Sequence, residues 1–201
     1  MAKKIVLDSG HGGDDPGTIA NGITEKDLTL KISQYMHNRL NELGIENSLS
    51  RSTDETLSPS VRPDRIQSFY GPGNDVIVVS NHINAGGGDG AEVIYALRNS
   101  DRLSSIISDN LSAAGQNVRK YYQRRLPSNP DLDYYYVLRD TPNNETIIVE
   151  YGFADSTGDD VNQLKNNRQD LAEAVVKSLA AYVGVSYTPI AGENDYVVKA
   201  G

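Results

Sequence analysis

Two histidines of this sequence stand in glycine-rich segments that directly follow short apolar runs. His11 lies in "DSGHGGDDPG", after the apolar residues 5–7. His82 follows residues 76–79 and precedes the glycines 86–88. Short runs rich in β-branched residues are typical of buried strands, and ligands collect at the carboxyl ends of strands in an open α/β sheet. The two imidazoles therefore occupy equivalent positions, where they could serve as metal ligands.

A catalytic zinc ion commonly takes three protein ligands, such as two histidines and a glutamate, and leaves a fourth position for water. The chain contains no cysteine, so a metal must be held by His, Asp or Glu. Glu25 is the candidate carboxylate, because with Thr24 as N-cap it falls in the first turn of a helix that follows the His11 loop. A glutamate there is also an ordinary capping residue, and the spacing leaves both roles open.

A glycine-rich loop between a strand and a helix can instead bind phosphate. The segment around His11 lacks the Gly-Lys-Ser/Thr ending of a P-loop and the glycine spacing of a dinucleotide-binding fold. Asp14 and Asp15 would also repel a phosphate group. The metal interpretation is therefore favoured.

Alternating strands and helices must position these residues. Apolar residues at helical spacing predict helices over residues 28–43, 103–118 and 171–182, with a shorter one near 62–70. Strands are expected at residues 5–7, 45–49, 76–79, 93–97, 134–138 and 147–149. This order predicts one α/β domain with a mostly parallel, roughly six-stranded sheet flanked by helices.

Glu150 directly follows the last of these apolar runs and ends it, at the point where a buried strand meets the expected cleft. A strand-end carboxylate of this kind either faces solvent or takes part in the chemistry of the cleft. The residues alone favour the first interpretation.

Composition restricts the class of partner. The 201 residues carry a formal net charge of -8, which argues against nucleic acid or an anionic membrane surface as the main partner. The first apolar run is too short for the core of a signal peptide, and no later segment could span a bilayer. Residues 184–194 are small, polar and turn-prone, and we expect them to form a linker.

Five segments together resemble a known family. "DSGHGGDDPG", "ITEKDLTLKI", "SNHINAGGGDGAEVIY", "YYVLRDT" and "IIVEYGF" are similar, in order and approximate spacing, to the zinc-dependent N-acetylmuramoyl-L-alanine amidases that cut bacterial peptidoglycan. The resemblance implies a catalytic domain over residues 1–183, one Zn²⁺ per chain and a muramyl-peptide substrate. It places the family's metal ligands on His11, Glu25 and His82, and its catalytic glutamate on Glu150.

Two further assignments concern Arg139 and the last residues of the sequence. Arg139 in "VLRDT" could bind a carboxylate of the stem peptide or stabilise the tetrahedral oxyanion, although an ion pair with an acidic neighbour explains it equally well. Residues 195–201, "DYVVKAG", resemble the opening of a LysM module that binds cell-wall glycan, so we expect the start of a truncated module there.

Two alternative functions remain open at this point: a zinc peptidase acting on stem peptides, and a non-catalytic wall-binding module. In every case the site of action is expected to be the bacterial cell wall. Because this chain carries no signal peptide, we expect release through a holin-type pore or by mother-cell lysis.

Overall fold

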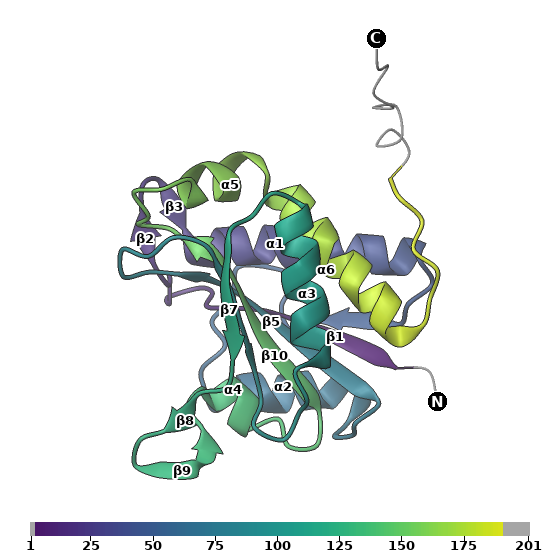
Figure 1. The fold of residues 1–201 in the computed structure, drawn as a ribbon. Helices are drawn as coiled ribbons and strands as arrows, with labels where there is room; N and C mark the ends of the chain where they lie inside the picture. Colours follow the sequence, from purple (N-terminus) through teal and green to yellow (C-terminus); the bar gives the residue numbers. More distant parts are fainter. Residues whose placement is uncertain (1–2, 191–201) are drawn as a thin grey trace.

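A six-stranded sheet forms the centre of the computed structural model, which describes residues 3–190 (Figure 1). In spatial order its strands are β4 (Asn47–Leu49), β1 (Lys4–Ser9), β5 (Val76–Asn84), β10 (Glu145–Phe153), β6 (Ala91–Tyr95) and β7 (Val118–Tyr122). Every neighbouring pair is parallel except β10 and β6, which are antiparallel. The prediction of a mostly parallel sheet of about six strands is confirmed.

Helices cover both faces of this sheet and produce three layers. One face packs against α1 (Glu25–Glu42), α3 (Arg102–Ala113) and α6 (Arg168–Val183), and the other against α2 (Arg62–Tyr70) and α4 (Tyr136–Arg139). The remaining elements are α5 (Asp160–Asn166) and two small hairpins, β2 (Ile19–Ala20) with β3 (Ile23–Thr24) and β8 (Arg125–Leu126) with β9 (Asn129–Asp133). No helix among residues 3–190 is both long and apolar enough to cross a bilayer.

Alternation along the central strands divides the core in two. In β5, Ile77 and Val79 belong to the larger apolar cluster beneath α1, α3 and α6, whereas Val78 belongs to the smaller cluster beneath α2 and α4. Because side chains of a strand alternate between faces, His82 points to the same face as Val78. In β10, Glu150 likewise follows Ile148 on the α2 and α4 face. His82 and Glu150 therefore emerge together beyond the smaller apolar cluster.

Two of the expected elements are wrong. The helix expected over residues 103–118 ends at Ala113, because Gly115 takes a left-handed conformation (φ +90°) and Val118 begins β7. The strand expected at residues 134–138 is not formed, since Tyr136–Arg139 is the single turn α4. Val137 and Leu138 are both buried, which a strand with one covered face does not allow for consecutive residues.

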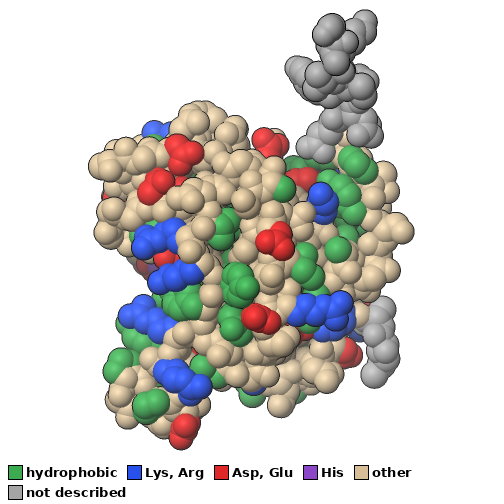
Figure 2. Space-filling view, viewed as in Figure 1, with side chains coloured by type: hydrophobic (Ala, Val, Ile, Leu, Met, Phe, Trp, Pro, Cys, Tyr) green, Lys and Arg blue, Asp and Glu red, His purple; other side chains and the backbone are tan. Residues whose placement is uncertain are grey.

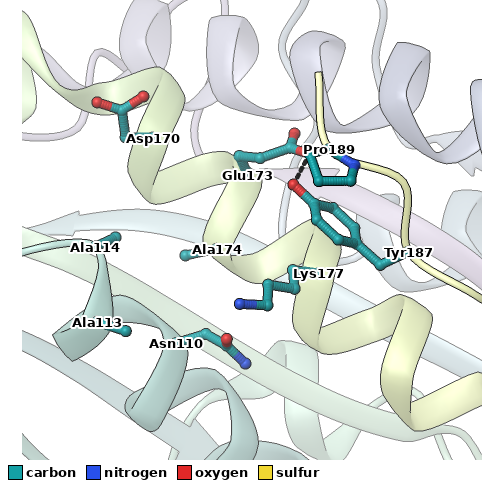
Figure 3. A pocket seen from close by; sticks show the side chains of 9 residues that line it. All are labelled: Asn110, Ala113, Ala114, Asp170, Glu173, Ala174, Lys177, Tyr187 and Pro189. Atoms are coloured by element: carbon teal, nitrogen blue, oxygen red, sulfur yellow. Dashed lines mark hydrogen bonds between the residues drawn. The ribbon is translucent and has the colours of Figure 1, made fainter. Parts of the chain in front are cut away.

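The segment after α6 lies against the domain. The Val185 amide donates to the Ala180 carbonyl at 2.9 Å, the Tyr187 hydroxyl donates to Glu173 at 2.8 Å, and Arg39 donates to the Thr188 carbonyl at 2.9 Å. A cavity of about 490 Å³ lies between this segment, α3 and α6, and its lining contains none of the candidate site residues (Figure 3). The first part of the expected linker thus packs on the helices as far as Pro189. Its last part and the LysM-like residues 195–201 lie outside the described residues.

These contacts predict a stabilising role for residues 185–190. A chain ending at Gly184 should melt several degrees below a chain ending at Ile190, because it loses the hydrogen bonds of Tyr187 and Thr188, each contributing about 1 kcal/mol. Thermal unfolding followed by circular dichroism measures this difference. Equal melting temperatures for the two chains would contradict the stabilising role, and activity at 25 °C is expected to be the same in both.

Candidate metal centre

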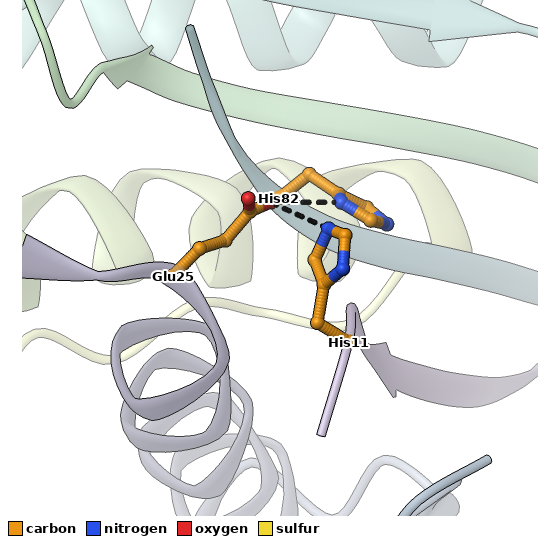
Figure 4. Close-up of side chains that lie close together, drawn as sticks. All are labelled: His11, Glu25 and His82. Carbon is orange, nitrogen blue, oxygen red and sulfur yellow. Dashed lines mark hydrogen bonds and ion pairs between the residues drawn. The ribbon is translucent and has the colours of Figure 1, made fainter. Parts of the chain in front are cut away.

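Three side chains from separate parts of the chain converge at one end of the sheet (Figure 4). His11 comes from the loop after β1, Glu25 from the first turn of α1, and His82 from β5. Glu25 Oε1 lies 3.2 Å from His11 Nε2 and 3.0 Å from His82 Nδ1, and the imidazole centroids are 5.0 Å apart. The structure thus brings together the three residues that the sequence nominated.

The donor set fits a divalent ion such as zinc. Zinc binds imidazole nitrogen and carboxylate oxygen at about 2.0–2.2 Å, so two ligands of a tetrahedral site lie about 3.3 Å apart. The two distances from Glu25 to the histidines are close to that value. One ligand atom from each residue lies within 4.8 Å of the others, so a single ion can contact all three.

Glu25 is held as an anion. Its side chain is 3 % exposed, Oε2 accepts the Thr18 amide at 2.8 Å, and Oε1 accepts the Ile83 amide at 3.0 Å. Burial alone would raise its pKa, but hydrogen bonds with His11 and His82 lower the pKa well below the usual range. A carboxylate fixed in this way is ready to act as a ligand.

The backbone of the His11 loop passes so close to His82 and Glu25 that two of its positions must be glycine. A Cβ on Gly10 would stand 2.4 Å from the imidazole of His82. A Cβ on Gly17 would stand 2.6 Å from Glu25 Oε2, and this glycine also has a left-handed φ of +63°. His11 itself adopts φ +59°, a conformation that side chains rarely take and that the surrounding contacts must maintain.

Asp15 orients the ring of His11. Its Oδ2 lies 2.8 Å from His11 Nδ1, which leaves Nε2 facing Glu25. Burial disfavours the imidazolium of His11, but the hydrogen bonds with Glu25 and Asp15 raise its pKa above the ordinary value. A carboxylate on the second nitrogen of a ligating histidine fixes the ring and makes it a better ligand. From the sequence, Asp15 was interpreted only as a charge that repels phosphate, although it follows His11 by four residues and could reach its ring.

Two buried arginines hold the backbone of the loop. Arg62, at the start of α2, donates to Asp8 and to the Ser9 carbonyl at 2.7 Å each, and to the His11 carbonyl at 2.8 Å. Arg51 donates to the carbonyls of Ser9 and Gly10, both at 3.1 Å. Burial would raise the pKa of Asp8, but Arg62 and two serine hydroxyls lower it below its usual value. These arginines donate to three successive loop carbonyls, and sequence reasoning missed both.

Glu150 lies on the next strand, opposite His82 in the register of β5 and β10. Its Oε2 is buried and has no hydrogen-bond partner, so the interpretation as a solvent-facing carboxylate is not favoured. Burial raises the pKa of Glu150 to about 7, with His82 acting in the opposite direction and Glu25 adding to the rise. A carboxyl group that exchanges its proton near neutral pH is suited to general acid and base chemistry.

Arg139 stands at the end of α4 and is not one of the three converging side chains. It donates to the Asp133 carbonyl at 2.9 Å and to the Tyr134 carbonyl at 3.3 Å, and its Nε lies 3.2 Å from Asp140. These contacts favour the ion-pair interpretation of the sequence analysis. A contact between Arg139 and substrate stays a prediction.

Similarity to known proteins identifies the family of the chain. Residues 5–181 match the family model described as N-acetylmuramoyl-L-alanine amidase. The chain belongs to this family. The amidase is 33% identical over 187 residues to the N-acetylmuramoyl-L-alanine amidase CwlM of Bacillus licheniformis, covering 91% of this chain and 70% of that protein. It is also 33% identical over 197 residues to the sporulation-specific N-acetylmuramoyl-L-alanine amidase of Bacillus subtilis, covering 94% of this chain and 71% of that one.

Solved structures share the fold of the amidase. The catalytic domain of CwlV from Bacillus (Paenibacillus) polymyxa aligns with a TM-score of 0.77 at 21% identity, covering 92% of this chain and 99% of that domain. The CwlD amidase of Clostridioides difficile aligns with a TM-score of 0.77 at 25% identity, covering 92% and 100%. The expected family and α/β fold are therefore confirmed.

The contact between Asp15 and His11 makes a prediction about metal affinity. Asp15→Ala should weaken metal binding by about 10- to 100-fold, since the ring of His11 loses the carboxylate that orients it. Competition with a chelator of known affinity measures the change. Asp14→Ala is the matched control, because Asp14 contacts Thr56 and not His11. Equal affinities for the two variants would show that Asp15 does not orient the ligand.

The buried pair of Asp8 and Arg62 makes a prediction about stability. Arg62→Met should lower the free energy of unfolding by about 3–5 kcal/mol, because it leaves the Asp8 carboxylate buried without its cation. Urea denaturation measures the loss. The double variant Asp8→Asn/Arg62→Met should be more stable than Arg62→Met alone. If it is equally unstable, the cost arises from the loop carbonyls and not from the unpaired charge.

Proposed function

We propose that the amidase is a zinc-dependent hydrolase that cleaves the amide bond between N-acetylmuramic acid and L-alanine in peptidoglycan, and that it acts on the bacterial cell wall. The observation that supports this most strongly is the convergence of His11, Glu25 and His82 beside the half-buried Glu150, whose Oε2 is buried and has no hydrogen-bond partner. Two imidazoles and one carboxylate form a catalytic zinc set that leaves one position open. The family and its relatives are named N-acetylmuramoyl-L-alanine amidases, and this name indicates which bond we expect the protein to cleave.

Zinc bound by these three residues would polarise the scissile carbonyl and acidify a water molecule, lowering its pKa to about 7. Glu150 has the raised pKa and the position to take the proton from that water as it attacks the carbonyl carbon. The same carboxyl group then donates the proton to the departing amine of L-alanine. The C–N bond breaks in this step, which gives the lactyl carboxylic acid of the muramic acid and the free amine of L-alanine. One carboxyl group thus acts first as base and then as acid, and it ends in the protonation state in which it began.

The rest of the site serves this proton transfer by fixing positions. Asp15 keeps Nε2 of His11 directed at the centre, and the Thr18 and Ile83 amides keep the Glu25 carboxylate in place. Glu150 is held beside His82 by the pairing of β10 with β5. A site whose ligands are already oriented loses little conformational entropy when it binds the ion or the substrate.

Hydrolysis of purified peptidoglycan tests the proposal. The wild-type protein, loaded with zinc, should release new N-terminal L-alanine amines and no new reducing sugar ends. A zinc peptidase would instead expose amines of other stem residues, and a non-catalytic wall-binding module would release nothing. Either result would overturn the proposed reaction. His82→Ala should lose both bound zinc and activity, because the ion loses one of three ligands.

The role of Glu150 has its own test. Glu150→Gln keeps the size of the side chain but removes the base, so turnover should fall by at least about 100-fold while zinc content and melting temperature persist. Zinc is measured by metal analysis and turnover by the release of L-alanine amines. Activity within a few-fold of the wild type would refute the role. Loss of zinc in this variant would instead indicate that Glu150 is a ligand of the ion.

A further inference from the structure

Positive charge is concentrated on one edge of an otherwise acidic protein. Residues 118–139 contain five Lys and Arg residues against two Asp residues, although the whole chain has a net charge of -8. Four of the five, Arg119, Lys120, Arg124 and Arg125, are exposed on β7 and the start of the β8–β9 hairpin. We call these four residues the basic edge. Figure 2 shows Lys and Arg side chains in a column on the face formed by these elements, with apolar side chains between them.

Strand register connects the basic edge to the candidate metal centre. His82 pairs with Glu150, Glu150 pairs with Glu92 of β6, and Glu92 pairs with Lys120. Directly paired residues point to the same face of a sheet, so these four side chains form one row across β5, β10, β6 and β7. Adjacent strands lie about 4.8 Å apart, which places Lys120 about 10 Å from Glu150 along the row.

The cations of the basic edge exceed the acidic groups that pair with them. Arg119 Nε lies 3.2 Å and Lys120 Nζ 3.9 Å from the buried carboxylate of Glu92. Within residues 3–190, Glu92 is the one carboxylate within 4.0 Å of any member of the basic edge. The row therefore carries a surplus of positive charge at its outer end.

Aromatic side chains hold these cations at the surface. The guanidinium of Arg124 stacks 3.8 Å from the ring centroid of Tyr134, and Lys120 Nζ lies 4.2 Å from that of Tyr122. Tyr121 and Tyr134 are exposed beside them. Cations fixed over rings lose little freedom when they bind an anion, and the exposed rings offer apolar contact to a peptide.

We propose that the basic edge is the binding site for the free carboxylates of the peptidoglycan stem peptide, and that it directs the peptide along the row from Glu150 towards β7. This inference rests on the proposed function. The lactyl carboxyl group of the muramic acid is consumed in the scissile amide, so the negative charge of a muramyl-peptide lies on the amine side of that bond. Three residues of extended chain span about 10 Å, so carboxylates near the start of the stem peptide reach Lys120. Arg124 follows β7 on the side that leads away from the metal centre, where it can contact carboxylates further along the peptide.

Chemically amidated peptidoglycan tests the inference. Purified peptidoglycan is freed of phosphate polymers, and one half has its carboxylates converted to carboxamides with carbodiimide and ammonia. At low ionic strength the wild type should release L-alanine amines about fivefold more slowly from the amidated half, as expected for the loss of one or two exposed ion pairs. In Lys120→Gln/Arg124→Gln this preference should disappear, because the rate on free-carboxylate peptidoglycan falls to the unchanged rate on the amidated form. Lys31→Gln/Lys177→Gln removes the same charge elsewhere and should behave as the wild type.

Each other outcome overturns the inference. If the variant keeps the wild-type preference for free carboxylates, or if the wild type has no preference, the basic edge does not bind the stem peptide. If a preference depends on the basic edge only in walls that keep their phosphate polymers, the ligand is the polymer. The rate on amidated peptidoglycan reports whether the variant is folded and active. Absence of amine release from unmodified peptidoglycan by the wild type would contradict the proposed function, and this inference with it.

Discussion

The buried ion pair between Asp8 and Arg62 is the constraint on which the geometry of the centre depends. Asp8 follows the apolar residues of β1 one position before the strand ends, and its buried carboxylate would be costly there without a cation and the two serine hydroxyls that donate to it. The guanidinium of Arg62 also donates hydrogen bonds to the carbonyls of Ser9 and His11. The pair therefore anchors the strand end and sets the path of the loop that presents the first histidine.

Glu25 joins this loop to the rest of the domain. Its two oxygens accept backbone amides from Thr18 and Ile83 and face both histidines, so one carboxylate connects the His11 loop, α1 and β5. Such a buried anion is tolerated because every group around it donates or can carry positive charge. Glu150 is the opposite case, since its Oε2 has no donor and its pKa is raised. Two carboxyl groups of one site thus have pKa values shifted in opposite directions, because their surroundings differ.

The sequence predicts the parts of this protein that depend on local patterns. Buried β-branched runs revealed the central strands, and helical spacing revealed α1, α2 and α6. His11 and His82 could be nominated because they directly follow such runs. β7 could not be predicted, because its exposed cations and tyrosines give no apolar alternation and its pairing with β6 is a long-range contact. Arg51, Arg62 and Asp15 were missed for a related reason, since their partners are loop carbonyls and a ring nitrogen that only the folded chain brings near.

The position of β7 has a consequence for the behaviour of the protein in solution. A strand at the border of a sheet presents unpaired amides and carbonyls to which a strand of another molecule can add, and natural proteins oppose this with charged side chains or very short border strands. Here β4 closes one border with only three residues, and β7 at the other carries Arg119 and Lys120. Two molecules that approached through β7 would bring like charges face to face. The cations to which we assign substrate binding therefore also oppose pairing between the sheets of two molecules. Replacing them with apolar residues would leave an edge strand that is prone to aggregation.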